Sequence, residues 1–202
     1  MITSAPPINT ASDRILLPIS FDAAKMKAEV DALNLRPFMY YESIPLRAPA
    51  HQIDPTVPFP PPASDFADGS WCDWLDVSFL SDLPYITSVV DYFKEHTKVN
   101  LVRLLRLEAG AVVKEHTDPT LGLQIEKSVI RLTVPISGGD QVDFYLNNKI
   151  VPMQPGECWY MRLTDPHKII HQGPEERINL TIDMIPNEWV QQFILDAEKG
   201  KN

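Results

Sequence analysis

The chain has 202 residues, and its 18 lysines and arginines against 27 aspartates and glutamates give a net charge of −9. Hydrophobic residues make up 44% of the sequence, which is enough for a buried core and excludes a disordered chain. The acidic balance argues against binding to nucleic acid or anionic lipid, because both need a basic surface. We therefore expect one folded domain that binds neither nucleic acid nor membrane.

The two cysteines, Cys72 and Cys158, lie far apart and form no Cys-x-x-Cys motif, so neither a disulfide framework nor a thiolate zinc site is expected. No apolar run approaches the ~20 residues that span a bilayer. The first residues, MITSAPPINTASDR, lack the basic and apolar regions of a signal peptide. These features predict a cytoplasmic protein in a reducing compartment.

The N-terminal half predicts two helices and one strand. Residues 1–13 read as a flexible tail, and residues 14–202 as a single domain. Apolar residues recur at helical spacing in Phe21–Leu33, with Ser20 as the expected N-cap. Phe38–Leu46 is typical of a strand, and Asp82–His96 of a second helix.

Proline is abundant, with 19 residues, and 7 of these lie between Pro45 and Pro62. Because proline cannot donate the hydrogen bonds of a sheet, this stretch predicts an extended loop. The loop and the residues after it carry Phe59, Phe66 and Trp71. Two interpretations stay open: a lid over a binding site, or a loop that only packs on the scaffold.

From Asn100 onward the sequence consists of short segments rich in β-branched and aromatic residues, separated by turn signals. Such regular short strands indicate a β-sandwich or barrel. A last helix is expected at Asn187–Lys199. The strand segments are NLVRLLRLE, VIRLTVPI, VDFYL, ECWYMRL and INLTIDMI. The predicted fold is mainly β with flanking helices.

His116 and Asp118 are two residues apart, so in an extended segment both side chains project to the same face. An imidazole and a carboxylate there can bind one cation together. A third ligand is offered by His167 or His171. Two histidines and one carboxylate on one face of a metal form the facial triad of non-haem iron(II) oxygenases. The alternative is a loop histidine beside a turn aspartate, without a metal.

A possible anion site lies close to the later histidines. His167 and Arg177 are ten residues apart, with the turn HQGPEE between them. A β-hairpin closing on that turn makes them cross-strand neighbours, with Cβ atoms about 5 Å apart. Arg177 also shares a polar face with Asn179 and Thr181. The arginine would then bind an anionic ligand beside the metal, unless it is exposed at the hairpin edge.

Five of the eight arginines lie on expected strands. An acidic protein that keeps arginines within strands is expected to bind small anions there, although exposed edge positions are the alternative for at least one of them. These residues are Arg103, Arg106, Arg131, Arg162 and Arg177.

The chain resembles the aspartyl/asparaginyl β-hydroxylase family in the order and spacing of four elements. These are HTD, RLTVPI, PGECWYMRLTDPH, and Arg177, which lies ten residues after His167. The resemblance covers Asn100–Asp183 and is closest to small bacterial L-proline cis-hydroxylase-like enzymes. These are Fe(II)- and 2-oxoglutarate-dependent oxygenases, so the resemblance implies a double-stranded β-helix core of the jelly-roll, cupin-like kind.

The resemblance implies roles for individual residues. His116, Asp118 and His167 match the iron ligands, which are the catalytic centre, and Arg177 matches the arginine that binds the distal carboxylate of 2-oxoglutarate. His171 is only six residues before Arg177, so it is expected near the turn and away from the barrel interior.

A second co-substrate contact is expected around Arg131, where the family has an Arg-x-His segment. Thr133 stands in the place of that histidine, so a contact made there is lost or replaced by a hydroxyl. The substrate is expected near Arg103, Arg106 or Arg131, with Trp159 as a wall of the pocket or, alternatively, as a core residue.

The implied activity is hydroxylation of an unactivated C–H bond in a small carboxylate-bearing substrate, with a free amino acid as the first expectation. 2-Oxoglutarate and O2 are then converted to succinate and CO2. The alternatives are a peptidyl, carrier-bound or lipid substrate, a cupin-type metalloenzyme without 2-oxoglutarate, and a non-catalytic barrel that binds a small acid. Desaturation, the regiochemistry and the oligomeric state stay open.

Overall fold

A computed structural model describes residues 3–54, 56–57, 72–138 and 141–200. Within these ranges the α-helices are α1 (Ala23–Ala32), α2 (Pro84–Lys94) and α3 (Glu188–Lys199). The strands are β1 (Arg14–Ser20), β2 (Tyr41–Pro49), β3 (Trp74–Asp76), β4 (Val99–Leu107), β5 (Val112–His116), β6 (Ile130–Pro135), β7 (Val142–Leu146), β8 (Lys149–Val151), β9 (Glu157–Met161), β10 (His167–His171) and β11 (Arg177–Met184). Two short 3-10 helices, Ala50–Gln52 and Ser78–Asp82, flank β3.

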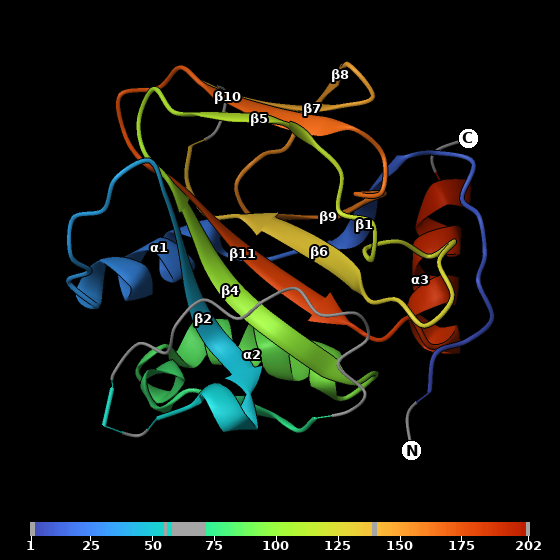
Figure 1. Cartoon of the computed structure of the whole chain (residues 1–202), viewed down its shortest axis with the longest axis horizontal. Helices are drawn as coiled ribbons and strands as arrows, with labels where there is room; N and C mark the ends of the chain where they lie inside the picture. Colours follow the sequence, from blue (N-terminus) through green and yellow to red (C-terminus); the bar gives the residue numbers. More distant parts are fainter. Residues whose placement is uncertain (1–2, 55, 58–71, 139–140, 201–202) are drawn as a thin grey trace.

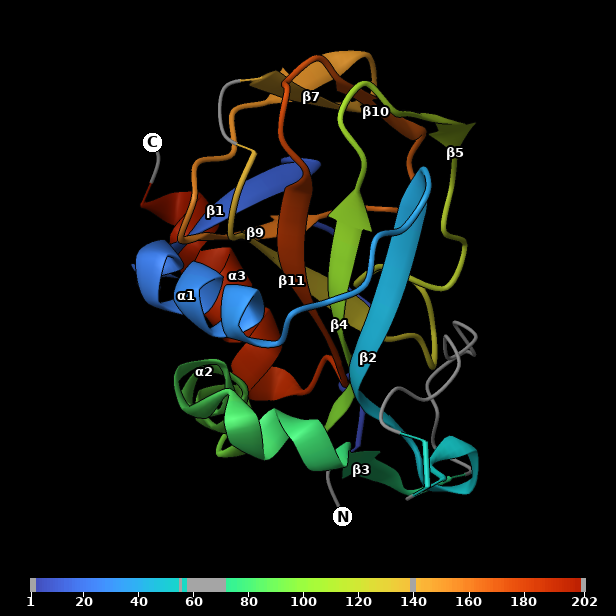
Figure 2. The ribbon, with the colours of Figure 1, turned by 90° about the vertical axis from the view of Figure 1, so that its left-hand side faces the viewer.

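The strands form two antiparallel sheets. The larger sheet has the order β1-β9-β6-β11-β4-β2-β3, and the smaller sheet has the order β5-β10-β7-β8. Figure 1 shows the smaller sheet above the larger one, and Figure 2 shows all three helices on one side of β11, β4 and β2. The prediction of a mainly β fold with flanking helices is confirmed.

Strand β11 shows how the larger sheet divides the interior. Its alternate side chains Ile178, Leu180 and Ile182 are fully buried in an apolar core that also contains side chains of α2 and α3. The intervening side chains of Asn179 and Thr181 face a cavity instead. The period of two therefore separates an apolar, helix-facing side from a polar side, as the alternation in the sequence predicts. A second apolar core includes residues of the smaller sheet, among them Phe144 and Leu146.

The helices begin later than the sequence pattern suggests. The N-cap of α1 is Asp22 and not Ser20, and its carboxylate accepts a hydrogen bond from the Lys25 N–H. Helix α2 begins at Pro84, with no side-chain cap. Asn187 caps α3 by accepting from the Val190 N–H. None of the helices in the described ranges is long and apolar enough to cross a membrane.

Two features of the N-terminal half differ from the expectations. Strand β1, which the sequence analysis missed, pairs with β9. Pro45 and Pro49 lie in β2 and not in a loop. Pro45 lies at an irregularity in the pairing with β4 and Pro49 ends the strand, two positions where a missing donor is tolerated. Residues 58–71, with the expected lid residues Phe59, Phe66 and Trp71, lie outside the described residues, as does Pro55.

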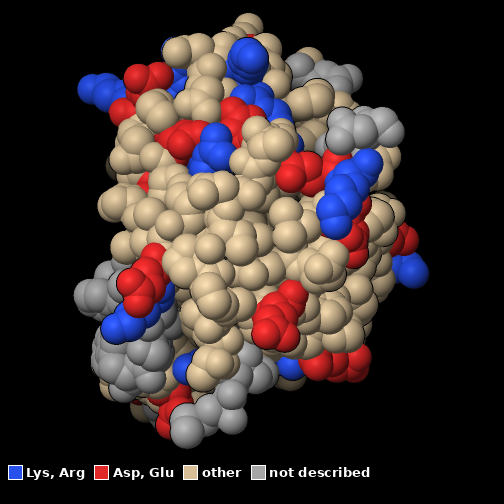
Figure 3. Space-filling view, turned by 90° about the vertical axis from the view of Figure 1, so that its right-hand side faces the viewer, with Lys and Arg blue, Asp and Glu red and all other residues tan. Residues whose placement is uncertain are grey.

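The first residues make contacts with the body of the protein. The Ala5 N–H donates to the carbonyl of Pro186, and the Ile8 N–H donates to that of Leu123. The expected division into a tail and one domain stays a prediction. On the face that carries α3, acidic and basic side chains lie in small mixed groups at several places around uncharged surface (Figure 3).

Candidate metal centre

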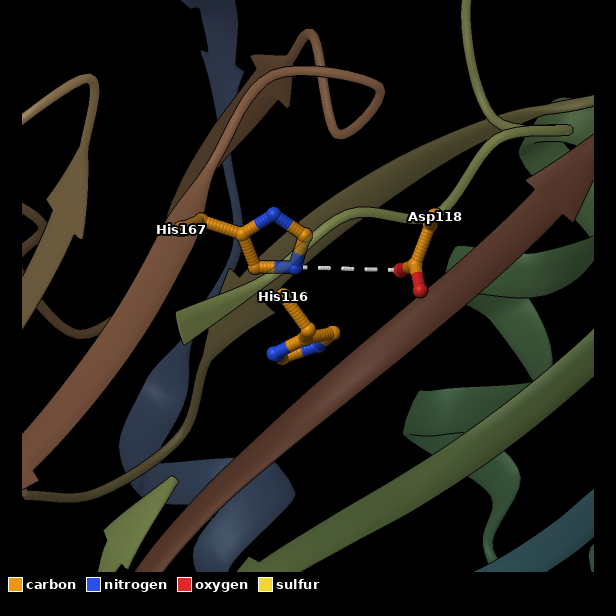
Figure 4. A group of neighbouring side chains, drawn as sticks. All are labelled: His116, Asp118 and His167. Carbon is orange, nitrogen blue, oxygen red and sulfur yellow. Dashed lines mark ion pairs between the residues drawn. The ribbon is translucent and has the colours of Figure 1, made fainter. Parts of the chain in front are cut away.

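The paired strands β5 and β10 bring together three potential metal ligands. His116 ends β5 and lies directly opposite His167, the first residue of β10. Asp118 follows two residues after His116. One ligand atom from each side chain lies within 4.8 Å of the others. Figure 4 shows the imidazole of His167 facing the carboxylate of Asp118. Nε2 of His167 lies 3.8 Å from Oδ2 of Asp118.

Backbone carbonyls fix which nitrogen of each histidine faces the cluster. Nδ1 of His116 lies 2.8 Å from the carbonyl oxygen of Lys114, and Nδ1 of His167 lies 3.0 Å from that of Asp165. A carbonyl oxygen only accepts, so each Nδ1 carries a proton. In the neutral imidazole, Nε2 then keeps its lone pair, which is the arrangement of metal-binding histidines.

Burial differs within the cluster. His167 is 4% exposed, whereas the side chain of Asp118 is one-quarter exposed and His116 is exposed. Burial is the largest cause of a lowered pKa of His167, and the nearby His116 and Arg131 add to it. The hydrogen bond to the Asp165 carbonyl and the charge of Asp118 oppose this shift without reversing it. Since the neutral form binds metals, this environment favours ligation by His167. Two imidazole nitrogens and one carboxylate oxygen are the donor set of non-haem Fe(II) sites, so these residues fit iron.

The cluster lines a cavity of about 540 Å³ between the two sheets. The larger sheet contributes Arg177, Arg131 and Thr133 to its lining, and the smaller sheet contributes Phe144 and Ile169 besides the histidines. The apolar part of this lining was not predicted from the sequence, because Phe144 and Ile169 resemble ordinary strand residues.

Arg177 lies in this cavity as a buried cation. Burial lowers its pKa to about 10, while Tyr41 opposes that shift. With its amide oriented so that both ends find partners, Asn179 accepts a hydrogen bond from Arg177 Nη2 at 2.6 Å. Gly138 has a positive φ of 103°, and a Cβ there would lie 2.8 Å from Cγ of Arg177. Only glycine leaves room for the arginine in that backbone conformation.

The predicted hairpin between His167 and Arg177 is wrong. His167 pairs with His116 and with Leu146 in the smaller sheet, whereas Arg177 pairs with Leu107 in the larger one. The turn between them carries the chain from one sheet to the other. Both residues still line the same cavity, but they do so from opposite sheets.

His171 does not join the cluster. Its Nε2 donates to the carbonyl of Glu175 at 2.6 Å, and its Nδ1 accepts from the Gly173 N–H at 3.1 Å. Its imidazole therefore stabilises the turn between β10 and β11. The structure thus brings His167, and not His171, to His116 and Asp118.

A sequence model of the aspartyl/asparaginyl β-hydroxylase family matches residues 75–186, which is more than half of the chain. The chain belongs to this family. Its members are named for a hydroxylation, and the match includes all three potential metal ligands together with Arg177.

Two further comparisons agree with this membership. This chain is similar to L-proline cis-4-hydroxylase of Rhizobium meliloti (strain 1021), with 23% identity over 117 residues. That match covers 58% of this chain and 41% of the relative, less than half of the relative's length. The fold resembles a 2OG-Fe(II) oxygenase family protein from Burkholderia pseudomallei, with a TM-score of 0.52, 12% identity and coverage of 87% and 85% of the two chains. The predicted double-stranded β-helix fold is thereby confirmed.

Within this β-hydroxylase fold, most of the strand arginines are paired with carboxylates. Arg131 binds Asp183 through Nε and Nη2, both at 2.7 Å. Nη2 of Arg103 lies 3.8 Å from the same carboxylate. Arg162 binds Asp165 at 2.9 Å. The expectation that these arginines bind a small anion gains no support from this geometry, because each of them lies beside a carboxylate of the protein.

Three residues expected to bind the substrate do not line this cavity. Arg106 binds Glu42 at 2.6 Å and Glu176 at 2.8 Å. Trp159 packs in the second core, and its Nε1 donates to Glu157. Neither these two residues nor Arg103 is among the cavity-lining side chains. The geometry gives no support to a direct substrate contact by any of the three.

Asp183 was not among the predicted site residues. It lies on the same face of β11 as Arg177, Asn179 and Thr181, and only 3% of it is exposed. A carboxylate at that position of an alternating strand implies a buried cationic partner. The alternation in RINLTID therefore indicates that Asp183 lies on the polar face of the strand.

Proposed function

We propose that this chain is an Fe(II)- and 2-oxoglutarate-dependent oxygenase that hydroxylates an unactivated C–H bond of a small carboxylate-bearing substrate. The observation that carries the proposal is one cavity that holds His116, Asp118 and His167 together with the buried Arg177. The first three fit iron, and the fourth fits the far carboxylate of a dicarboxylic co-substrate. When bound, iron, 2-oxoglutarate and O2 supply the oxidising power, and the products are succinate, CO2 and the hydroxylated substrate.

The chain's own residues have three tasks. The imidazoles of His116 and His167 and the carboxylate of Asp118 would hold an iron ion, and all three side chains line the cavity. Arg177 binds a carboxylate bidentately, and Asn179 holds the guanidinium in place. Apolar side chains such as Phe144 and Ile169 exclude water from the reacting atoms.

Two observations support a free amino acid as the substrate. The cavity volume of about 540 Å³ is in the range of small-molecule sites. The Rhizobium meliloti relative is named for its action on L-proline. We therefore propose that proline and other free amino acids are the first compounds to test.

A peptidyl or other larger substrate is the second candidate, and the rim of the cavity favours it. Tyr40 and Tyr41 line the cavity but are 49% and 45% exposed, and the adjacent Met39 is 86% exposed. Such exposed apolar side chains beside a site are able to contact a substrate that extends beyond it.

The test is turnover. Purified protein is incubated with Fe(II), 2-oxoglutarate, O2 and a panel of free amino acids and short peptides, and mass spectrometry follows succinate and products 16 mass units heavier. We expect succinate formation coupled to one hydroxylated product, and none with His116→Ala. A suitable control is His96→Gln, because His96 stacks on Trp189 outside the cavity. Absence of 2-oxoglutarate turnover and of metal binding in the unmodified protein would contradict the proposal.

A further inference from the structure

Four charged side chains of alternating sign run from the metal cluster into the larger sheet. Oδ2 of Asp118 lies 3.5 Å from Nη1 of Arg131. Arg131 in turn binds both oxygens of Asp183, and Asp183 lies 3.8 Å from Arg103. These contacts therefore link the potential metal ligand Asp118 to the buried ion pair between Arg131 and Asp183, and Asp183 is not one of the three potential ligands.

The ion pair is much more firmly held than the ligand. Arg131 and Asp183 lie directly opposite each other on β6 and β11, two strands whose residues are all buried. The contact between them is bidentate, with two parallel hydrogen bonds. Asp118, by contrast, lies after the end of β5, and its side chain is one-quarter exposed.

The position of Arg131 matters because its guanidinium and a bound metal ion would compete for the carboxylate of Asp118. The oxygen of Asp118 that faces Arg131 is the same Oδ2 that faces Nε2 of His167. A guanidinium released from Asp183 is able to close from 3.5 Å to hydrogen-bond distance and to occupy that oxygen. A guanidinium held by Asp183 instead stays beside Asp118, where it orients the carboxylate by charge.

We propose that Asp183 is a positioning residue for the metal site, acting through Arg131 on Asp118. This inference rests on the proposed function, because it assigns Asp118 to the metal. It gives Arg131 a role different from the co-substrate contact that the resemblance implies. Nε and Nη2 of Arg131 bind Asp183, and Nη1 faces the metal ligand.

The decisive variant is Asp183→Asn, which keeps the size of the side chain. Its amide presents a donor to the guanidinium where the carboxylate presented a second acceptor. We expect the dissociation constant for Mn(II), measured by anaerobic calorimetry, to rise roughly 10- to 100-fold, as for other residues that orient metal ligands. The visible spectrum of the Co(II)-loaded protein should change as well, because the Asp118 carboxylate is displaced.

A matched control separates positioning from loss of stability. Glu42→Gln removes the charge of another ion pair of the larger sheet, between Glu42 and Arg106, which does not line the cavity. We expect it to lower the melting temperature but to leave the Mn(II) affinity and the Co(II) spectrum unchanged. If Asp183→Asn does not fold, Arg131→Lys tests the same link. Lysine keeps the positive charge, but its single ammonium cannot bind Asp183 bidentately and face Asp118 at the same time.

The outcomes are distinguishable. Wild-type affinity and an unchanged Co(II) spectrum in either folded variant overturn the positioning role and leave the proposed function intact. An equal loss of affinity in Glu42→Gln also overturns it, because the effect is then one of stability. Absence of metal binding in the unmodified protein overturns the proposed function, and the positioning role with it.

Discussion

The two sheets contribute opposite parts of the site and differ in burial. Strand β5 of the smaller sheet, which carries His116, is mostly exposed, whereas every residue of β6 and β11 in the larger sheet is buried. Two of the proposed metal ligands, His116 and His167, thus lie on the more accessible sheet, whereas the proposed co-substrate anchor Arg177 lies on the buried one. We therefore expect a change at the cluster of the smaller sheet to affect binding more than stability, and a change on the helix-facing side of the larger sheet to affect stability more than binding.

The largest effect is expected for His116→Ala. The side chain is exposed, with a hydrogen bond to the Lys114 carbonyl and a ring contact with His167, so the free energy of unfolding should change little. Metal affinity should fall by roughly 100-fold or more, beyond the 10- to 100-fold typical for residues that only orient a ligand. Calorimetry with Mn(II) and thermal unfolding of the metal-free protein measure the two quantities. A large loss of stability with retained affinity would refute the comparison for the smaller sheet.

The opposite result is expected for Leu180→Ala in the larger sheet. Leu180 is fully buried on the helix-facing side of β11. The variant should lose roughly 2–5 kcal/mol of unfolding free energy through lost contacts and a cavity. Below its melting temperature, Mn(II) affinity should stay within a factor of two of wild type. Denaturant unfolding and calorimetry together check this, and a proportional fall in affinity would show that the two faces of β11 are not independent.

A smaller effect on binding is expected for Arg177→Lys. Lysine keeps the charge but offers a single ammonium in place of the guanidinium fork. Loss of one charge-assisted hydrogen bond should raise the dissociation constant for 2-oxoglutarate roughly 10- to 100-fold. The affinity for Mn(II) alone should not change, because Arg177 lies on the other sheet. If both affinities fall together, Arg177 supports the metal cluster and does not act as a separate anchor.

The smallest effect is a pH dependence of the metal-free protein. The pKa of His167 is lowered on folding, chiefly by burial. The unfolded state therefore binds its proton more tightly, so stability is full above pH 6.5, the ordinary pKa, and falls as the pH drops from there towards the lowered pKa. Urea unfolding at several pH values should show this slope. It should be weaker in His167→Gln, and an identical slope in that variant would mean that another group is responsible.

Sequence reasoning located residues better than it located their neighbours. The spacing of His116 and Asp118 and the polar face of β11 follow from the period of a strand, which is a local property. Pairing between strands is not local, and the turn after His171 permits either a hairpin or a crossing between sheets. The hairpin prediction therefore failed, although both of its residues reach the cavity.

The arginines illustrate a second limit. A buried arginine needs a counter-charge, but the sequence does not show whether a ligand or the protein supplies it. Arg131 has Asp183, which lies 52 residues later. Arg106 has Glu42, which lies 64 residues earlier. Such distant partners are found only when the strand order is known, and that order left Arg177 as the candidate anchor for an anion.

We propose that one cavity binds iron through His116, Asp118 and His167, and 2-oxoglutarate through Arg177. An anaerobic titration of the protein with Fe(II) and 2-oxoglutarate, monitored by the visible absorption of the chelate, tests both parts of this proposal together. We predict a band that saturates at one equivalent of iron, is absent in His116→Ala, and requires more 2-oxoglutarate in Arg177→Lys. A protein that develops no band at any concentration, or a band that survives in His116→Ala, would contradict the account.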